Sequence, residues 1–282
     1  MRPIYAATAA LAALTITAPA VADHHMENPA MANHSMANHA MAAALADARR
    51  AADSARDQYR HPAETLAFFQ VKPGMTVVDV VPGGGWYTRV LASYLGKDGK
   101  YIGLNPDVAH SNSPRMAESW GGLGKTFPKS LSDWGLSGTN AVGMNSDEVT
   151  EAMHGTVDRA LIFREMHNLH RIGFLHYELD TLRDLLKDDG MLGIVQHRAK
   201  AWAPADYTDG SRGYMRQLDI IGLVEAHGFQ LVGTSEINAN PMDTADHPRG
   251  VWEMPPSWGS KDEKLKNLGE SDRMTLLFRK RQ

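Results

Sequence analysis

Short apolar runs alternate with helical patterns along most of the chain. Seven runs rich in β-branched and other apolar residues predict strands at 75–81, 100–104, 140–144, 159–163, 191–196, 229–236 and 273–280. Strands separated by helices indicate a parallel sheet with helices on both faces, and the last two strands, which have no helix between them, indicate an antiparallel pair at one edge. The sequence therefore predicts an α/β fold, a doubly wound and mostly parallel sheet with an antiparallel last strand.

The helical patterns differ in strength. Residues 174–186 form a helical face, with Gly190 positioned to stop the helix. The face consists of Leu175, Leu179, Leu182, Leu185 and Leu186. Other helices are expected at 43–60, 61–69, 89–95 and 214–226, the first of them exposed and supported by an Arg49–Asp53 pair. Two long segments without clear periodicity, at about 106–150 and 237–272, are expected as insertions within a domain of residues 43–282. Because it is long and contains Trp and Pro, the second is expected to be a lid or binding element.

The first 22 residues have the layout of a secretory signal peptide. Arg2 precedes an apolar stretch, and Ala20-Val21-Ala22 supplies a small-x-small cleavage site before Asp23. The apolar stretch is shorter than the ~20 residues of a spanning helix. A buried Ala-rich helix is the alternative. The pattern predicts a periplasmic or secreted protein with no membrane segment after cleavage.

Residues 23–42 are a low-complexity segment rich in histidine and methionine, in which MANH occurs twice. The possible ligands in it are His24, His25, His34, His39, Met26, Met31, Met36 and Met41. Imidazole and thioether groups suit copper, so one interpretation is a copper-binding tail. The other is a disordered linker between the signal peptide and the fold.

Composition removes several classes of function. The chain has no cysteine, which excludes thiol nucleophiles, zinc–thiolate sites and disulfides. Its net charge is −4 over 282 residues. Since affinity for phosphate backbones depends on clustered Lys and Arg, no nucleic-acid partner is expected, and the expected partner is a small-molecule substrate.

The strand at 75–81 ends in Pro82 and three glycines, Gly83, Gly84 and Gly85, followed by Trp86-Tyr87-Thr88. In open α/β sheets, ligands bind beyond the carboxyl ends of strands, and a glycine turn lets a ligand approach the backbone. A tight strand–helix turn with no ligand is the structural alternative. Thr88 occupies the third glycine position of the dinucleotide fingerprint, and no GK[ST] follows, so neither nucleotide motif fits.

This stretch resembles the first motif of S-adenosylmethionine-dependent methyltransferases of Rossmann-like fold. The resemblance covers about residues 62–279 and is strongest to an exported group of predicted methyltransferases with YRHPAETLAFF and PGGGWYT. It implies that S-adenosylmethionine is the cofactor. The implied contacts come from Asp79, Gly83, Gly84, Gly85, Thr88 and Asn105. Two positions depart from the pattern: Val81 replaces the first glycine, and Asn105 replaces the acid that grips the ribose, a role that Asp107 could take if its loop bends back.

The fourth strand runs into FREMHNLHRIG, at the edge of the sheet that faces the methyl group in this family. His167 is the expected general base, and Arg164 the expected ligand of an acidic substrate. Tyr59, His61 and His197 are expected to lie around the same site, at this edge of the sheet. A capping network is the alternative for the polar cluster, and a metal site is conceivable if His61, His167, His170 and His197 meet.

The sequence therefore leads to three hypotheses. The first is an exported methyltransferase that acts on a small molecule. The second is a methyltransferase-like protein that binds another ligand without catalysis, and the third is a periplasmic copper-handling protein that uses the His/Met tail. We expect the first.

Overall fold

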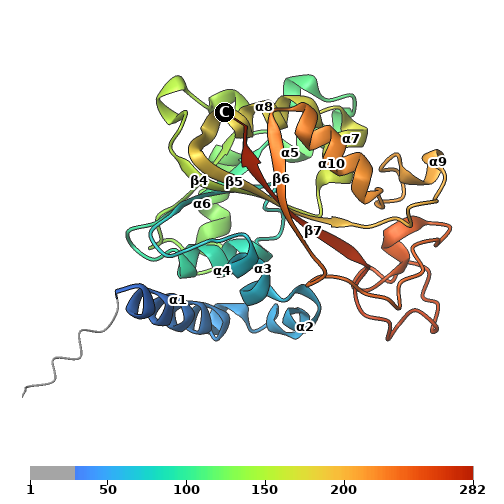
Figure 1. Ribbon diagram of the computed structural model, residues 1–282, viewed down its shortest axis with the longest axis horizontal. Coiled ribbons are helices and arrows are strands. Elements are labelled where there is room, and N and C mark those ends of the chain that lie inside the picture. Colours follow the sequence, from blue (N-terminus) through green and yellow to red (C-terminus); the bar gives the residue numbers. More distant parts are fainter. Residues whose placement is uncertain (1–28, 282) are drawn as a thin grey trace, which may run out of the picture.

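The computed structural model describes residues 29–281, which form a seven-stranded sheet flanked by helices (Figure 1). The strand order is β3-β2-β1-β4-β5-β7-β6. The strands are β1 (Thr76–Val80), β2 (Lys100–Asn105), β3 (Ala141–Asn145), β4 (Val157–Phe163), β5 (Leu186–His197), β6 (Phe229–Ser235) and β7 (Arg273–Lys280). Strands β1 to β5 pair in parallel, whereas β7 is antiparallel to both β5 and β6. The predicted fold class is confirmed, although β7 lies inside the sheet and β6 forms the edge.

The helices connect the strands in the expected alternation. They are α1 (Pro29–Leu45), α2 (Asp57–Arg60), α3 (Pro62–Phe68), α4 (Trp86–Tyr94), α5 (Pro114–Trp120), α6 (Leu123–Asp133), α7 (Met166–Ile172), α8 (Leu175–Leu185), α9 (Ala205–Thr208) and α10 (Gln217–Ala226). Four of the five leucines expected on one face of α8 are buried in it, whereas the fifth, Leu186, is the first residue of β5. Gly190 does not stop this helix, because α8 ends at Leu185 and Gly190 lies within β5.

Two apolar cores form on opposite faces of the sheet because strand side chains alternate. Val78 and Val80 of β1 point to the face covered by α7, α8 and α10, whereas Val77 points to the face covered by α1, α3 and α4 (Figure 1). Asp79 points to the same face as Val77 and is buried, so β1 contains one buried carboxyl among its valines.

The expectation of a disordered linker at 23–42 is wrong for the part that the structure describes, which forms helix α1. This helix begins at Pro29 and covers most of the His/Met-rich segment; residues 23–28 and the expected signal peptide lie outside the described residues. Met41 and Ala44 are buried in the core beneath α4. Alanine and methionine have high helix propensity, and this tertiary contact adds stability that the polar repeat does not supply alone.

The segment after α1 is broken into short turns rather than the single helix expected at 43–60. Arg49 pairs with Asp47, and Asp53 pairs with Arg89 of α4. The expected Arg49–Asp53 pair is therefore wrong. Each partner finds a closer charge because the chain folds back over α4 instead of continuing as a helix.

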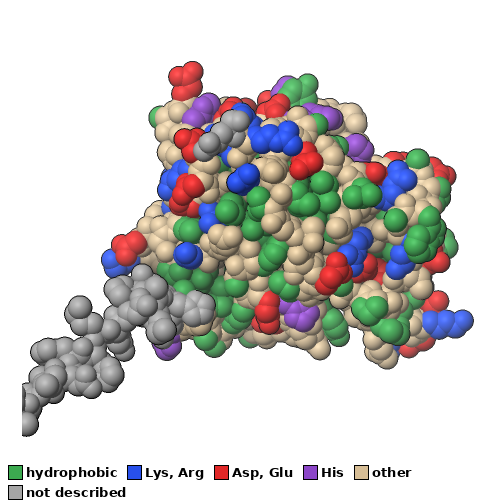
Figure 2. All heavy atoms as spheres, viewed as in Figure 1, with side chains coloured by type: hydrophobic (Ala, Val, Ile, Leu, Met, Phe, Trp, Pro, Cys, Tyr) green, Lys and Arg blue, Asp and Glu red, His purple; other side chains and the backbone are tan. Residues whose placement is uncertain are grey.

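The two expected insertions differ in how much secondary structure they contain. Residues 106–150 contain α5, α6 and β3, whereas the last long loop is largely irregular and is tied down by Asp243, which accepts hydrogen bonds from Tyr214 and from His247. Among the described residues, no helix is both long and apolar enough to cross a membrane. Basic and acidic side chains are interspersed over the face shown in Figure 2.

Candidate functional site

A cavity of about 330 Å³ lies where β1 and β4 end, and we call it the arginine cavity. Its walls come from the turn after β1, the residues after β4, the segment before α3 and one residue of the last long loop. The lining residues are Asp53, Arg56, Arg60, Asp79, Val81, Pro82, Gly83, Gly84, Trp86, Tyr87, Arg89, Phe163, Arg164, Glu165 and Pro256. The carboxyl edge of the sheet is the place where open α/β folds bind ligands.

The glycine turn presents bare backbone to this cavity. A Cβ atom added at Gly84 meets no atom within 4 Å, and one added at Gly83 meets only the Val81 carbonyl at 3.8 Å. Gly85 has another role, because a Cβ there would lie 2.6 Å from the Trp134 ring. Two of the three glycines therefore leave space for a ligand, and the third allows Trp134 to pack.

Val81 and Arg164 have strained backbones at equivalent places. Val81 follows β1 with φ 51° and Arg164 follows β4 with φ 63°, both in the left-handed region that favours glycine. Such conformations cost about 1–3 kcal/mol each and concentrate at functional sites. The resemblance assigns glycine to position 81, and the backbone there has kept a glycine-like conformation although the residue is valine.

Glu270 pairs with three arginines, of which Arg56 and Arg60 line the cavity. Its carboxylate pairs with Arg56 at 2.6 Å, Arg60 at 3.2 Å and Arg273 at 3.0 Å. Burial alone would raise the pKa of Glu270, but the three guanidinium groups outweigh it and hold that pKa at about 2. One carboxylate cannot satisfy three guanidinium groups, and the group remains net positive.

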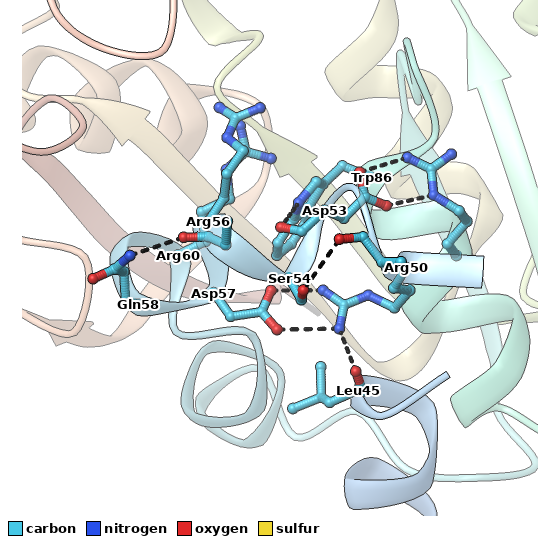
Figure 3. Close-up of polar contacts among 12 residues, drawn as sticks. Leu45, Arg50, Asp53, Ser54, Arg56, Asp57, Gln58, Arg60 and Trp86 are labelled. Atoms are coloured by element: carbon cyan, nitrogen blue, oxygen red, sulfur yellow. Dashed lines mark hydrogen bonds and ion pairs between the residues drawn. The ribbon is translucent and has the colours of Figure 1, made fainter. Parts of the chain in front are cut away.

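Each of these arginines keeps a buried nitrogen without a hydrogen-bond partner: Nη2 of Arg56, Nη1 of Arg60 and Nε of Arg273. Arg60 is only 2% exposed, and its pKa is lowered by burial and by Arg164. Arg56 and Arg60 extend side by side, away from the Arg50–Asp57 pair below them (Figure 3). Buried unpaired donors are costly, so their arrangement favours an anionic ligand.

Aromatic rings form the wall opposite the glycines. The Tyr87 ring stacks on Phe163 with centroids 3.5 Å apart, and Trp86 meets Tyr87 edge-on at 4.7 Å. The guanidinium of Arg60 lies 4.6 Å from the centroid of the Trp86 ring. The cavity therefore combines cationic donors with π-faces that attract positive charge.

The segment before α3 closes the cavity through contacts with α4. Asp53 accepts two hydrogen bonds from Arg89, and its carbonyl accepts one from the Trp86 indole (Figure 3). Arg89 also donates to the Gly84 carbonyl. These bonds fix the glycine turn relative to the arginines.

Two carboxyl groups in the cavity have pKa values close to neutrality. Burial raises the pKa of Asp79 to about 7, against a hydrogen bond from the Tyr101 hydroxyl. Burial likewise raises the pKa of Glu165 to about 7, against a hydrogen bond from Asn168. A carboxyl with this pKa can accept a proton at neutral pH.

The structure separates the residues that the resemblance assigned to the cofactor. Asp79, Gly83 and Gly84 line the cavity, whereas Gly85 and Thr88 do not. The Thr88 hydroxyl is buried and lies 2.8 Å from the hydroxyl of Tyr101, which in turn bonds to Asp79. Thr88 therefore orients Asp79 through Tyr101 rather than facing the cavity.

Asn105 also lies outside this cavity. Its amide donates a hydrogen bond to the Trp120 carbonyl in the insertion that follows β2. Asp107 does not replace it, because Asp107 caps the next turn and lines a different cavity. The side chains expected to grip a ribose are thus turned toward the insertion.

The expected catalytic histidines lie together but away from the cavity. The rings of His167 and His197 are 5.5 Å apart, and neither residue lines the arginine cavity. Burial lowers the pKa of His167 to about 4, and that of His197 lies well below its usual value. His167 contacts Gln196, and His197 contacts Ser271 at 2.6 Å, so both are neutral near pH 7 and held in buried networks.

Arg164 lines the cavity as expected, but Tyr59 and His61 do not. The Tyr59 carbonyl accepts a hydrogen bond from Arg273, and His61 forms the left-handed junction between α2 and α3. Tyr59 therefore supports Arg273 from outside the cavity, and His61 sets the turn that follows Arg60.

The conceivable metal site of four histidines does not form. Over residues 36–281, whose side chains the structure describes, no group of three or more His, Asp or Glu side chains is placed to hold a metal ion. In the tail, His24, His25 and Met26 lie outside the described residues, as do the side chains of Met31 and His34. His39 is exposed on α1, as is Met36, whereas Met41 is buried in the core.

The sequence reasoning missed Arg56, Glu270 and the role of Glu165. Arg56 and Arg60 are four residues apart, a spacing that places both on one side of a helical segment, and this signal was available. Glu270 gave no local signal, because it meets Arg60 across 210 residues of sequence.

Two solved structures show which known fold this is. A putative sarcosine dimethylglycine methyltransferase from Galdieria sulphuraria aligns with TM-score 0.50 and 13% identity, over 81% of this chain and 85% of that chain. Geranyl diphosphate C-methyltransferase from Streptomyces coelicolor A3(2) aligns with TM-score 0.52 and 12% identity, over 84% of this chain and 87% of that chain. No family model and no curated protein matches the sequence. The fold is therefore the Rossmann-like fold of methyltransferases.

Proposed function

We propose that the protein is an S-adenosylmethionine-dependent methyltransferase that acts on a small molecule, with the arginine cavity as its reaction site. The observation that supports this most is the open backbone at Gly83 and Gly84. It lies beside Arg56 and Arg60, each of which keeps one buried nitrogen without a hydrogen-bond partner, in a methyltransferase fold.

The residues present fit the amino-acid half of the cofactor. Arg56 and Arg60 offer N–H donors to a carboxylate, and Trp86 and Tyr87 supply an aromatic wall beside them. When bound, the cofactor supplies a methyl group on positively charged sulfur. The role of the chain is to hold the reactants against the glycine turn and to exclude water.

Glu165 is the proposed acceptor of the proton that the substrate nucleophile loses. An oxygen, nitrogen or sulfur nucleophile that carries a proton must lose it, and Glu165 lines the cavity with a pKa near 7. We assign Glu165, and not His167, as the proton acceptor. Arg164 makes no hydrogen bond through its side chain to another described residue, and we assign it to an acidic group of the substrate.

A second function is favoured by one observation. The cavity lacks the acid that would hold a ribose, since Asn105 is bonded to the Trp120 carbonyl. A methyltransferase-like protein that binds a small carboxylate, without methyl transfer, would need only the arginines and the glycine turn.

Calorimetry with S-adenosylmethionine, S-adenosylhomocysteine and acetate separates the two functions. The methyltransferase should bind both cofactor forms, and Gly84→Val should weaken that binding at least about 100-fold, because its side chain fills the open space above the turn. Gly138→Val is the matched control, since Gly138 lies in an exposed turn and also has open space around it. Binding of acetate but of neither cofactor form would establish the second function instead.

Turnover tests the assignment of Glu165. With a substrate found by screening metabolites for methyl transfer, Glu165→Gln should lower the rate about 10²-fold or more while cofactor affinity is kept. The wild-type rate should rise with pH through about 7, as the Glu165 carboxyl loses its proton. An unchanged rate in Glu165→Gln would refute the assignment.

We also propose that the protein works outside the cytosol, from the signal-peptide layout of residues 1–22. Cell fractionation with mass measurement of the mature N-terminus checks this, and a chain that begins at Asp23 is the expected product. A full-length chain confined to the cytosol would contradict export.

A further inference from the structure

A second cavity, of about 260 Å³, lies where β2 and β3 end, and we call it the acidic cavity. Asp107 lines it from the turn after β2, Asp147 from the turn after β3, and Glu178, Asp180 and Asp184 from α8. No lysine or arginine is among its lining residues. Five carboxyl groups around a small space create a strong negative potential.

Glu178 is the residue that points to a ligand. It is 1% exposed, and its Oε2 accepts a hydrogen bond from the Ser146 hydroxyl at 2.8 Å. Its Oε1 is buried and has no hydrogen-bond partner. A buried carboxylate oxygen without a donor is costly. A ligand that donates a hydrogen bond to Glu178 Oε1 would supply the partner that the protein does not provide.

Two of the other carboxylates have partners of their own. Asp107 accepts from the Ala109 amide and lies 3.4 Å from His110, while Asp180 accepts from His227. Asp147 and Asp184 are exposed at the rim. Since no three of the described acidic or histidine side chains converge as metal ligands, the charge is spread along the cavity rather than focused on one point.

Aromatic groups give the cavity an apolar wall. The Tyr177 ring stacks on His110 with centroids 3.6 Å apart, and Phe174 lines the inner end. Methylene groups between charged ends would pack against these rings while ammonium groups meet the carboxylates. Spread negative charge with an apolar wall is complementary to a flexible chain that carries more than one ammonium group.

We propose that the acidic cavity binds a small aliphatic polyamine, with one ammonium group donating to Glu178 Oε1. The site is independent of the arginine cavity, and it shares no lining residue with it.

The pH dependence supports the same assignment. Burial raises the pKa of Glu178 to about 7, and the Asp107 charge adds to this. The groups that face the cavity are Asp107 and His110 from one turn, Asp147 from the next, and Asp180 and Asp184 from α8. An ammonium group favours the charged carboxylate, so affinity should rise as pH increases through 7, with release of a proton.

The test is calorimetry of the full chain with spermidine at pH 6 and pH 8. We expect saturable one-site binding that is tighter at pH 8. Glu178→Gln should weaken it at least about tenfold, and Asp147→Asn about threefold, because the second change removes only a rim charge. Asp188→Asn is the control: this carboxylate is 92% exposed and lies outside the cavity, so its removal should leave affinity unchanged.

Four results would overturn the proposal. They are no saturable binding of spermidine, equal weakening by Asp147→Asn and Asp188→Asn, displacement of spermidine by stoichiometric Mg²⁺ or Ca²⁺, and competition by adenosine, which would assign the cavity to a nucleoside site. Asp147→Asn changes an exposed residue, and it keeps the test valid if Glu178→Gln fails to fold.

Discussion

The arginine cavity and the acidic cavity lie along the same edge of the sheet but compensate their charges differently. Beside the arginine cavity, one buried carboxylate, Glu270, is shared by Arg273 and by the lining residues Arg56 and Arg60, and guanidinium nitrogens remain unpaired. In the acidic cavity, one buried carboxylate, Glu178, has a single hydroxyl donor, and no lysine or arginine lines the space.

The difference is visible in the two glutamate pKa values. Glu270 has a pKa of about 2 because surrounding positive charge outweighs burial, whereas Glu178 has a pKa of about 7 because burial is opposed only by one hydrogen bond. Glu270 thus stabilises the fold at neutral pH and Glu178 destabilises it. The same residue type contributes with opposite sign, because its neighbours decide which protonation state is favoured.

The largest expected effect comes from Glu270→Gln. Removing the charge leaves two buried arginines, Arg60 and Arg273, and the half-buried Arg56 without their counterion, and the free energy of unfolding should fall by about 3–5 kcal/mol. In the wild type, the Glu270 contribution is complete above its ordinary pKa of 4.5 and is lost as pH falls toward 2. Urea unfolding at pH 7 and at pH 3 measures both effects, and an unchanged midpoint at pH 7 would contradict this account.

The next effect has the opposite sign. The raised pKa of Glu178 means that stability falls as pH rises from 4.5 to about 7, a loss of up to about 3 kcal/mol. Glu178→Met removes this cost while Ser146 can still donate to the Asn105 carbonyl. Urea unfolding at pH 8 should therefore show a gain of about 2 kcal/mol, and the gain should vanish near pH 4.5. A loss of stability at pH 8 would show that Glu178 is compensated in a way the structure does not show.

Asn105→Asp tests whether the acid found here in the methyltransferases that the sequence resembles would bind the ribose in this chain. Aspartate cannot donate to the Trp120 carbonyl, so we expect a loss of about 1–2 kcal/mol in the free energy of unfolding and no gain in affinity for S-adenosylmethionine. Thermal unfolding and calorimetry on the same variant measure the two quantities. A tighter complex would mean that residue 105 turns toward the arginine cavity when a ligand binds.

Val81→Gly has the smallest expected effect. Relief of the left-handed backbone is offset by the lost side-chain packing and by the greater freedom of glycine in the unfolded chain, so stability should change by less than about 1 kcal/mol. Val80→Gly, one residue earlier in β1 and buried, is the matched control and should cost at least about 2 kcal/mol. Equal losses in the two variants would show that position 81 carries no strain.

Much of the fold could be predicted because it depends on local patterns. All seven predicted strands form within a few residues of their expected ends, and α8 buries four of its five expected leucines. The long connections were less predictable. Helix α1 is stabilised by burial of Met41 and Ala44, and the polar repeat around them gave no sign of that contact.

The candidate site was predictable only in part. Asp79, Gly83, Gly84 and Arg164 line the cavity as expected, because the ends of adjacent parallel strands always meet at one edge. His167 and His197 leave the ends of the expected strands, but their side chains enter a separate buried network. Strand-end position predicts the edge and not the direction in which a side chain points.

The sequence by itself determined the sheet, the bare glycine turn and the absence of thiol chemistry, since each follows from residue type and local spacing. Tertiary structure alone decided whether positive or negative charge predominates at each cavity. Glu270 reaches Arg60 across 210 residues, and Glu178 lies against the turns after β2 and β3 from a helix that follows β4. The free energy of a charge depends on burial and on neighbours within a few ångströms, and those neighbours come together only when the chain is folded.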